Sequence, residues 1–473
     1  MPNNRKTDVI ILGAGLAGLA AGYALSRNGR DILVIERDSR VGGLAKTVHH
    51  AGFRFDIGGH RFKTNNPFIE NLVTELMGGE LLQVKRSSKI LLRGKYFDYP
   101  LKPLNAFFGF GIPTATRILT DYLLERFLRA RKNIQLISLQ DWVVHNFGRT
   151  LFNIYFKEYS EKIWGLDCQE ICMEWVQQRI QGLSLGLAIK HALYKSAGGH
   201  LRTLTNTFLY PPQGIGQIGE KFAAEIRRKN DILTSSRIIQ IRHNGSRITG
   251  VVVQNGDTVS LCHGNEFISS IPLTVFVQLL NPKPPLPVLN TAARLKYRDL
   301  VVVTVMIDRA RVTDQTWIYI PEHSIPFGRI HEPTNWSPEM APEGKTHLVT
   351  EHFCFRGDDT WSASDQELVT LTVTSLESLG FIKRHEVIDG IVLRIPNAYP
   401  LFEVGYVKHY EILSRYVEGF NNLVPIGRGG LFKYYNMDHT IESGIEAADM
   451  ITSQHNKPDG SIQAEILATG TRP

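Results

Sequence analysis

The stretch DVIILGAGLAGLAAGYALSRNGRDILVIE, residues 8–36, decides the fold of this chain. It opens with a β-branched apolar run at 8–12, which is typical of a strand buried on both faces. A glycine turn, GAGLAG at 13–18, follows directly and leads into a helix rich in alanine and leucine. A second apolar run at 32–35 ends at Glu36. Strand, glycine turn, helix, strand and acid in this order predict a Rossmann-type unit that binds a dinucleotide.

Four residues of this unit are predicted to contact the dinucleotide. Gly13 allows the tight turn, Gly15 lets a pyrophosphate approach the backbone, and Gly18 lets the helix pack closely on the strand. The helix N-terminus adds free N–H groups and a partial positive charge that favours phosphate. Glu36 follows Gly15 by about 20 residues, where such folds place the carboxylate that binds a ribose hydroxyl.

Two Gly-Gly pairs come shortly after this unit. The first stands in Arg40-Val-Gly-Gly-Leu44 and the second in Asp56-Ile-Gly-Gly-His60. Such pairs indicate backbone that lies flat against a bulky cofactor. The order of motifs resembles that of the large FAD family of amine oxidases, protoporphyrinogen oxidases, phytoene desaturases and UDP-galactopyranose mutases. This resemblance implies FAD rather than NAD, and it adds Arg37, Gly42, Gly43, Leu44, Gly58 and Gly59 to the predicted cofactor site.

Hydrophobic periodicity divides the remaining chain into helical and strand-rich segments. Helices are expected over 66–77, 103–130, 138–147, 170–194, 364–385 and 438–452, so that 66–209 is mainly helical. Strands are expected within 232–270, where Asn-Gly pairs at 244–245 and 255–256 indicate hairpins, at 267–272, within 298–356 and at 423–427. The proline-rich stretch 275–290 predicts a connection.

The expected fold is α/β, with a discontinuous Rossmann-type FAD-binding domain, an inserted helical region and an antiparallel-sheet substrate domain. The FAD-binding domain is expected to combine 1–65, 210–290 and 386–455. The substrate domain is expected to combine 66–209 and 291–385, and residues 456–473 are expected to form a loose tail.

Several segments resemble the eukaryotic-type UDP-galactopyranose mutases more than the amine oxidases. They are DIGGH at 56–60, YP at 99–100, LQDWVVHNFG…EYSEKIWGL…WVQQRI at 139–180, WIYIP at 317–321, PFGR at 326–329, AYP at 398–400, GRG at 427–429 and NMDH at 436–439. Together they extend over nearly the whole chain, to about residue 452. The WIYIP…PFGR and WVQQR matches are the ones most specific to the mutases.

The mutase resemblance assigns roles to individual residues. It implies that His60, Arg179, Arg329 and Tyr399 are catalytic, and that Tyr99, Tyr159, Trp164, Trp317, Tyr319, Lys433 and Asn436 bind the substrate. It further assigns Ile238, Gly427, Arg428, Met437 and Asp438 to the cofactor, with no metal. For each arginine a surface or capping role remains the alternative, for the aromatic residues the alternative is ordinary core packing, and for His60 it is a structural role.

The implied chemistry is a rearrangement of a nucleotide-linked sugar. Arginines bind phosphate through two parallel hydrogen bonds and stay charged, so Arg179 and Arg329 would stabilise a departing nucleoside diphosphate. The resemblance implies that N5 of the reduced flavin then attacks the anomeric carbon. A flavin–sugar iminium forms, the sugar ring opens and recloses through another hydroxyl, and no net electron transfer occurs.

The chain departs from the mutase pattern at the nucleotide site. Lys433 stands where the mutases have a second arginine, and two residues are missing between Lys433 and Asn436. The polar run after the mutase YP is replaced by Leu101-Lys102-Pro103. These changes leave the identity of the sugar, and of the nucleotide, open.

Two other functions remain alternatives. A redox flavoenzyme of the amine oxidase, protoporphyrinogen oxidase or desaturase type could use FFGFG at 107–111 to line an apolar tunnel, and Lys296 as a residue near the flavin. Lys296 is also explained as a charged residue at the rim. The other alternative is a flavin-binding protein without catalysis.

The net charge indicates which kinds of partner the chain can bind. The formal charge of +7 over 473 residues fits an anionic substrate or a membrane-surface contact, and it does not require nucleic acid. The aromatic and basic segment 103–130 is either an amphipathic membrane-surface helix or a packed helix with a solvated basic end.

The four cysteines are expected to be small buried side chains. Neither a signal peptide nor a membrane span is expected, so the chain is predicted to be cytoplasmic.

Overall fold

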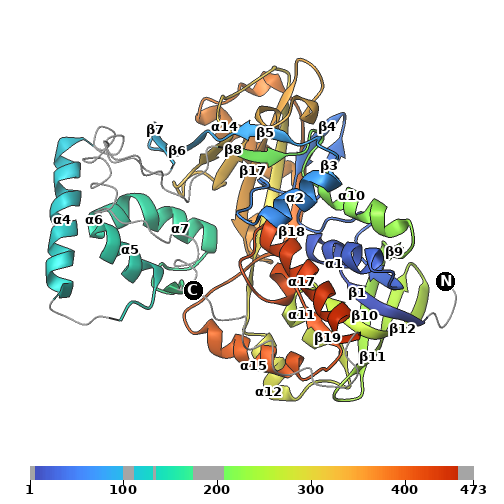
Figure 1. Ribbon diagram of the computed structural model, residues 1–473. Coiled ribbons are helices and arrows are strands. Elements are labelled where there is room, and N and C mark those ends of the chain that lie inside the picture. The colour runs from blue at the N-terminus through green and yellow to red at the C-terminus, as the bar shows by residue number, and fades with distance from the viewer. Residues whose placement is uncertain (1–5, 100–110, 131–134, 174–206, 456–473) are drawn as a thin grey trace.

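The computed structural model describes residues 6–99, 111–130, 135–173 and 207–455. These residues form a body of two large sheets with helices packed on them, and a helical region that stands to one side of the body (Figure 1). No helix in these ranges is both long and apolar enough to cross a bilayer.

The first sheet contains the βαβ unit predicted from residues 8–36. Its strand order is β13-β10-β11-β12-β1-β2-β9, with β19 beside the last residues of β12. β1 pairs in parallel with β2 and β12, and β2 pairs in parallel with β9. The strands are β1 Lys6–Leu12, β2 Ile32–Ile35, β9 Asp231–Leu233, β10 Ser236–His243, β11 Ile248–Asn255, β12 Thr258–Ser269, β13 Leu280–Asn281 and β19 Leu423–Pro425. The beginning, the middle and the end of the chain therefore share one sheet.

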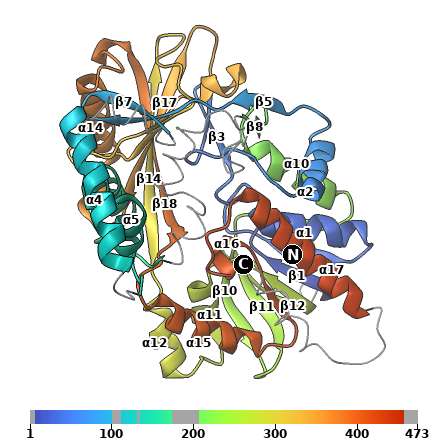
Figure 2. The same cartoon turned by 60° about the vertical axis from the view of Figure 1, so that its left-hand side comes forward.

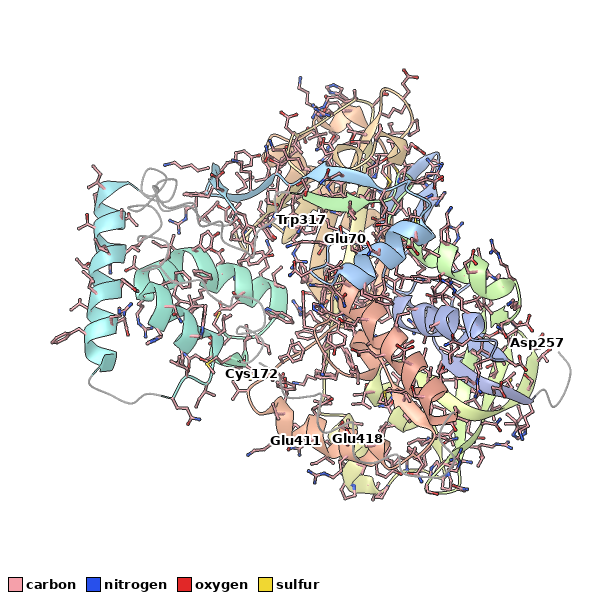
Figure 3. All side chains as sticks on the ribbon, in the orientation of Figure 1. Glu70, Cys172, Asp257, Trp317, Glu411 and Glu418 are labelled. Carbon is pink, nitrogen blue, oxygen red and sulfur yellow. The ribbon has the colours of Figure 1, made fainter. Side chains whose placement is uncertain are left out.

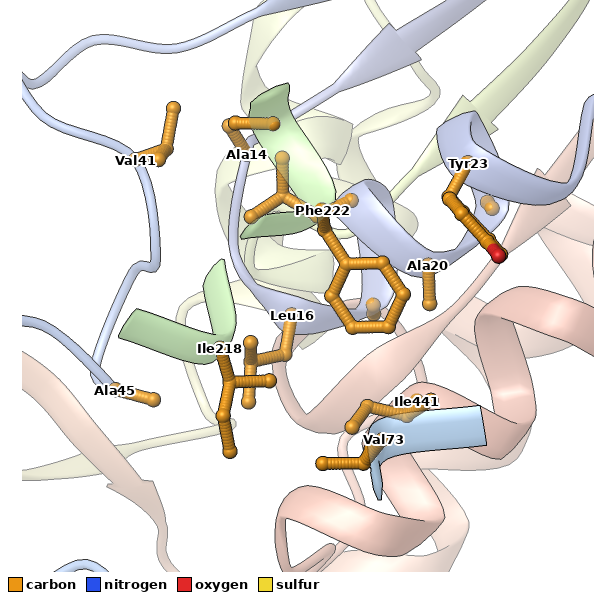
Figure 4. Close-up of a cluster of buried hydrophobic side chains, with 14 of the residues drawn as sticks. Ala14, Leu16, Ala20, Tyr23, Val41, Ala45, Val73, Ile218, Phe222 and Ile441 are labelled. Carbon is orange, nitrogen blue, oxygen red and sulfur yellow. The ribbon is translucent and has the colours of Figure 1, made fainter. Parts of the chain in front are cut away.

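Three helices pack together beside this sheet. α1 (Leu16–Arg27) contacts both α10 (Gly216–Arg227) and α17 (Met437–His455). Phe222 of α10 points into the cluster that α1 forms with its neighbours (Figure 4), and its ring lies 5.3 Å from that of Tyr23, edge to face. Nearly every residue of α1 is buried, which explains why its sequence is almost wholly apolar.

The second sheet has the order β18-β14-β17-β16-β15-β6-β7 and is antiparallel except for the parallel pair of β15 and β6. Its strands are β6 Ser88–Leu92, β7 Lys95–Asp98, β14 Tyr297–Ile307, β15 Trp317–Tyr319, β16 Arg329–His331, β17 Thr346–Cys354 and β18 Val387–Pro400. β14 and β18 run along the middle of the molecule in Figure 2. Alternate residues of β14 pack against α14 (Asp365–Ser378) and against the hairpin of β3 (Thr47–His50) and β4 (Phe53–Asp56).

The helical region lies at the left of Figure 1. It contains α4 Ile112–Ala130, α5 Leu139–Phe147, α6 Arg149–Leu151, the π-helical turn Phe152–Phe156 and α7 Lys157–Trp164. α4 buries Ile118 and Tyr122 and exposes Leu119, Leu123 and Phe127. Because α4 has both a packed and an exposed apolar face, the two interpretations of segment 103–130 both stay predictions.

The remaining elements connect these units. They are α2 Pro67–Leu76, the pair β5 Leu82–Lys85 and β8 Thr207–Tyr210, α11 Leu273–Leu279, α12 Leu286–Ala292, α13 Asp359–Ser362, α15 Tyr406–Glu418, α16 Gly427–Gly430, and short 3-10 turns at Pro333–Asn335, Pro338–Met340 and Arg384–Glu386. The four cysteines are buried, as the sequence predicts, and no disulfide joins them within the described residues.

The structure differs from the sequence prediction in several elements. Residues 82–98, expected in a mainly helical segment, contain three strands instead. β5 pairs with β8 and β6 pairs with β15, both far away in sequence, and β7 then pairs with β6. The expected strand at 267–272 is the end of β12. The proline-rich connection contains α11 and α12, whose N-caps are Pro272 and Pro285, since proline is tolerated where a helix begins.

Two further segments differ from the sequence prediction. The helix expected over 170–194 does not include Ile171 and Cys172, which form isolated β-bridges, and most of that segment lies outside the described residues. β18 pairs with β14 in the second sheet, so the third FAD-binding segment should begin after Pro400 rather than at residue 386. The division into two domains is otherwise still a prediction.

Candidate active site

The glycine turn between β1 and α1 is built by contacts between backbone segments. A Cβ added to Gly18 would lie 2.0 Å from the carbonyl oxygen of Gly13, so only glycine fits there. Gly42 donates its N–H to the carbonyl oxygen of Ala14 at 2.8 Å, and Gly43 lies against Gly15. The first N–H groups of α1 have no partner within the helix. The two glycine loops therefore form a cradle without side chains at a helix N-terminus, which fits a dinucleotide pyrophosphate.

Glu36 is fixed beside this turn. Its side chain is 7% exposed, and its carboxylate accepts hydrogen bonds from the backbone N–H of Ala14 at 2.7 Å and of Asp38 at 3.0 Å. A carboxylate held in this way fits the predicted contact with a ribose. Arg37 is instead exposed and lies 3.7 Å from Asp38, while Ile238 pairs with Val253 within the first sheet.

The second Gly-Gly pair lies beneath the second sheet. A Cβ on Gly59 would lie 1.6 Å from the Trp317 ring, so this residue too must be glycine. The N–H of Gly59 donates to Glu351 at 3.0 Å. His60 follows, with Nδ1 3.3 Å from the Gly58 carbonyl oxygen. Burial, and then the nearby Arg428, lower the pKa of His60 to about 4, so its imidazole is neutral at neutral pH.

A cleft of about 600 Å³ opens over His60. It lies in the central part of the molecule, where Figure 3 labels Trp317. Of the residues predicted from the sequence, those that line it are Gly59, His60, Trp317, Tyr319, Arg329, Tyr399, Arg428, Asn436, Met437 and Asp438. Residues predicted from separate motifs, spread over almost 400 positions of the chain, thus come together in one place.

Arg329 is held by two side chains, one of which is a fully buried carboxylate. Its Nη1 lies 3.0 Å from a carboxylate oxygen of Glu351, and its Nε donates to the Tyr159 hydroxyl at 3.1 Å. Glu351 is 1% exposed and uses its other oxygen to accept from Gly59. Glu351 therefore couples Arg329 to the glycine loop. Sequence reasoning missed it, although an acid in the middle of the apolar run HLVTEHFCF was a signal that could have identified it.

Arg428 and two tyrosines form a second group in the cleft. The rings of Tyr399 and Tyr434 are stacked with centroids 6.0 Å apart, and the Arg428 guanidinium lies 5.3 Å from each. Arg428 also donates to the carbonyl oxygens of Tyr435 and Ala398. Burial, and then Glu351, raise the pKa of Tyr399 to about 12, so its hydroxyl keeps its proton and can donate a hydrogen bond.

Three further cations line the cleft. Arg61 and Lys63 follow His60 in the chain, and Arg86 precedes β6. Near them the rings of Tyr99 and Tyr319 lie 4.5 Å apart. Sequence reasoning missed all three, although two basic residues directly after Gly-Gly-His were visible in HRFK at 60–63.

Some of the other predicted residues lie outside the cleft, and some belong to segments that the structure does not describe. Trp164 is 4% exposed and packs in a core cluster with Phe402, so its match to the mutases does not place it at the substrate. Lys433 is exposed and lies over Tyr435. Lys296, the residue of the redox alternative, forms an exposed ion pair with Glu403. Arg179, Pro100, Leu101-Lys102-Pro103 and residues 107–110 of FFGFG lie outside the described residues.

Comparison with known proteins places this site in a family. The family model described as flavin containing amine oxidoreductase matches residues 16–452. Protoporphyrinogen oxidase 2 of Arabidopsis thaliana is 29% identical over 150 residues, which are 30% of this chain and 29% of that protein. A probable UDP-galactopyranose mutase of Klebsiella pneumoniae is 23% identical over 175 residues, 36% of this chain and 43% of that protein. The chain thus spans less than half the length of the curated relatives it matches.

Solved structures share the fold over almost the full chain. Reduced UDP-galactopyranose mutase has a TM-score of 0.80 at 19% identity, with 96% of this chain and 95% of that chain covered. A putative protoporphyrinogen oxidase from Exiguobacterium sp. 255-15 has a TM-score of 0.72 at 16% identity, with 95% and 99% covered. The family model covers most of the sequence, and the glycine cradle fits the cofactor. The chain therefore belongs to the flavin-containing amine oxidoreductase family, and FAD is its cofactor.

Proposed function

We propose that this flavoenzyme rearranges a nucleotide-linked sugar without net oxidation or reduction. The observation that carries the proposal is the charge of the cleft. Five cationic side chains line it, Arg61, Lys63, Arg86, Arg329 and Arg428, against two carboxylates, Asp438 and Glu442. Such a lining attracts an anionic substrate and repels an amine. It supports a phosphate-bearing substrate over the cationic substrates of amine oxidases.

The aromatic residues support a nucleotide as part of that substrate. The Tyr99 and Tyr319 rings lie 4.5 Å apart, and Tyr159 makes an edge contact with Tyr319 at 5.6 Å. Aromatic faces at the edge of a cleft bind a planar base by stacking. We infer that the base lies at this end of the cleft and the sugar at the His60 end.

The polar residues at the His60 end suit a sugar. Tyr399 carries a proton that it can donate to a hydroxyl or phosphate oxygen, and the neutral His60 can accept or donate a hydrogen bond. Arg329 and Arg428 place fixed positive charge where a leaving diphosphate would develop negative charge. When bound and reduced, FAD supplies a nucleophilic nitrogen. The Gly13–Gly18 turn, Glu36, the Gly42–Leu44 loop, Gly59 and Met437 would hold it.

A redox reaction is the second candidate, and the family itself favours it. The comparisons include a putrescine oxidase and a putative protoporphyrinogen oxidase of the same fold. A cationic cleft suits a substrate with carboxylates as well as one with phosphates. This candidate therefore has to be separated from the first by experiment.

The test uses the purified protein with its FAD reduced anaerobically by dithionite. A panel of UDP- and dTDP-sugars is added, and the ring form of each sugar is determined by NMR. We expect one donor to be isomerised by the reduced enzyme only, with the flavin still reduced after turnover, and the rate to fall strongly in Arg329→Gln but less in Arg329→Lys. No isomer from any donor, together with bleaching of the oxidised flavin by an amine, a porphyrinogen or a polyene, would establish the redox candidate instead. Neither activity would favour a flavin-binding protein without catalysis.

A further inference from the structure

The five cations of the cleft differ in how they are compensated. Arg329 forms a buried ion pair with Glu351, and Arg428 donates to two backbone carbonyl oxygens. Arg61, Lys63 and Arg86 form no ion pair with any carboxylate in the part of the chain that the structure describes. The cleft therefore contains two compensated cations and three that lack an ion-pair partner among the described residues, although Arg61 and Arg329 lie 5.0 and 5.9 Å from the same Trp317 ring.

The three cations without an ion-pair partner destabilise one another's charged forms. Burial lowers the pKa of Arg61 and of Lys63, and Arg86 lowers both pKa values further because like charges repel. Asp438 acts in the opposite direction on Lys63. The other cleft carboxylate, Glu442, accepts a hydrogen bond from Asn66 at 2.7 Å. A bound anion would reduce the repulsion among Arg61, Lys63 and Arg86 that Asp438 and Glu442 do not neutralise.

Aromatic rings hold two of the three cations in position. The Arg61 guanidinium lies 5.0 Å from the centre of the Trp317 ring and 5.7 Å from that of Phe208. Arg86 lies 5.3 Å from the Tyr99 ring, and its Nε donates to the Ser88 hydroxyl at 3.2 Å. Guanidinium groups fixed against rings lose little entropy when they bind an oxyanion, and their N–H edges stay available to it.

We propose that Arg61, Lys63 and Arg86 form a phosphate subsite, separate from Arg329, and that the substrate carries a phosphate group that reaches it. Because the Tyr99 ring lies beside Arg86, the subsite is placed to bind the diphosphate of a nucleotide together with Arg329 and Arg428. A phosphate monoester elsewhere on the substrate has the same chemistry. This inference deepens the proposed function and rests on it for the identity of the substrate, while the anion site itself can be tested without turnover.

The experiment measures binding of inorganic pyrophosphate, UDP and UMP to the oxidised holoenzyme by isothermal titration calorimetry. The variants are Arg61→Gln, Lys63→Gln and the double variant. Arg311→Gln is the matched control, because Arg311 is an exposed arginine, 61% accessible, that pairs with Asp314 and does not line the cleft. The flavin spectrum and content of each variant show that it has folded and holds FAD.

We expect each single variant to weaken pyrophosphate binding about tenfold or more, and the control to leave it unchanged. Loss of UDP affinity in the same variants, with UMP affected less, identifies the nucleotide diphosphate as the ligand. Loss of pyrophosphate affinity alone identifies a phosphate elsewhere on the substrate. Equal pyrophosphate affinity in the wild type and the FAD-replete double variant would overturn the subsite. Absence of any sugar isomerisation, with the anion binding intact, would overturn the proposed function but not the subsite.

Discussion

The cofactor turn and the cleft are built in opposite ways. At the turn, backbone segments contact one another directly. Gly18 packs against the Gly13 carbonyl oxygen and the Gly42 N–H donates to the Ala14 carbonyl oxygen, so a side chain would not fit between these segments. In the cleft, charged side chains and rings meet, as Arg329 does with Glu351. Backbone contacts tolerate almost no substitution, whereas a lining of side chains changes its specificity with one residue. The comparison explains how one fold can hold the same cofactor and act on different substrates.

The strongest test of this comparison is a pair of glycine substitutions. Gly18→Ala places a Cβ 2.0 Å from a backbone oxygen, and we expect it to lower the free energy of unfolding by roughly 3 kcal/mol or more. Gly15→Ala places its Cβ 3.9 Å from the nearest atom, so the protein should fold with a stability within about 1 kcal/mol of wild type. It should nevertheless lose FAD, because the pyrophosphate must approach that backbone closely.

Urea unfolding of the apo-proteins and titration with FAD measure both effects. Gly15→Ala that binds FAD as tightly as wild type would show that the pyrophosphate does not lie on this turn. A fully stable Gly18→Ala would show that the helix can move away from the strand.

The same difference explains what could be predicted from the sequence. The turn is local, so spacing alone identified Gly13, Gly15, Gly18 and Glu36. The cleft depends on tertiary pairing. Glu351 reaches Gly59 across 292 residues, and no local pattern indicates that contact.

Resemblance predicted part of the cleft, and some other residues that it named do not line the cleft. His60, Trp317, Arg329 and Tyr399 all line the cleft, and each was identified by a motif match. Trp164 was matched equally well but is packed in the core, because a match carries no information on exposure. Strand β18 was missed since its pairing with β14 extends a segment whose own sequence, VIDGIVLRIPNAYP, alternates only weakly.

Asp56 lies close to the Gly58-Gly59 loop in the chain, and its raised pKa predicts an effect of pH on stability. It ends β4 just before the Gly58-Gly59 loop, is 1% exposed, and accepts hydrogen bonds from the Thr47 and Tyr210 hydroxyls and from the Ile215 N–H. Burial raises its pKa to about 7 from the ordinary 3.8. The folded protein therefore holds this proton at a pH where the unfolded chain has lost it. The stability that Asp56 contributes is complete below about pH 4 and is lost as the pH rises through about 7.

Asp56→Asn mimics the protonated carboxyl and should remove this dependence. Between pH 5 and pH 7 we expect the wild type to lose about 2 kcal/mol of unfolding free energy relative to the variant. Buried histidines with lowered pKa values, such as His347 and His352, act in both proteins alike, so the difference isolates Asp56. Urea unfolding at the two pH values measures it. Parallel pH profiles for the two proteins would show that the carboxyl is ionised in the folded state.

The smallest effect is expected at Lys433, where the sequence match and the structure disagree. The match offers Lys433 as the replacement for a phosphate-binding arginine, but the side chain is exposed, 5.7 Å from the Tyr435 ring, and does not line the cleft. An exposed cation–ring contact stabilises by at most about 1 kcal/mol. Lys433→Met should therefore leave UDP affinity within about twofold of wild type. Arg428→Met should weaken UDP affinity by tenfold or more, because Arg428 lies in the cleft and its guanidinium would form charge-assisted hydrogen bonds with a phosphate. Calorimetric titration of both variants measures this ratio. A tenfold loss in Lys433→Met would mean that the loop carrying Lys433 moves over the substrate, so that ligand binding brings Lys433 into the cleft.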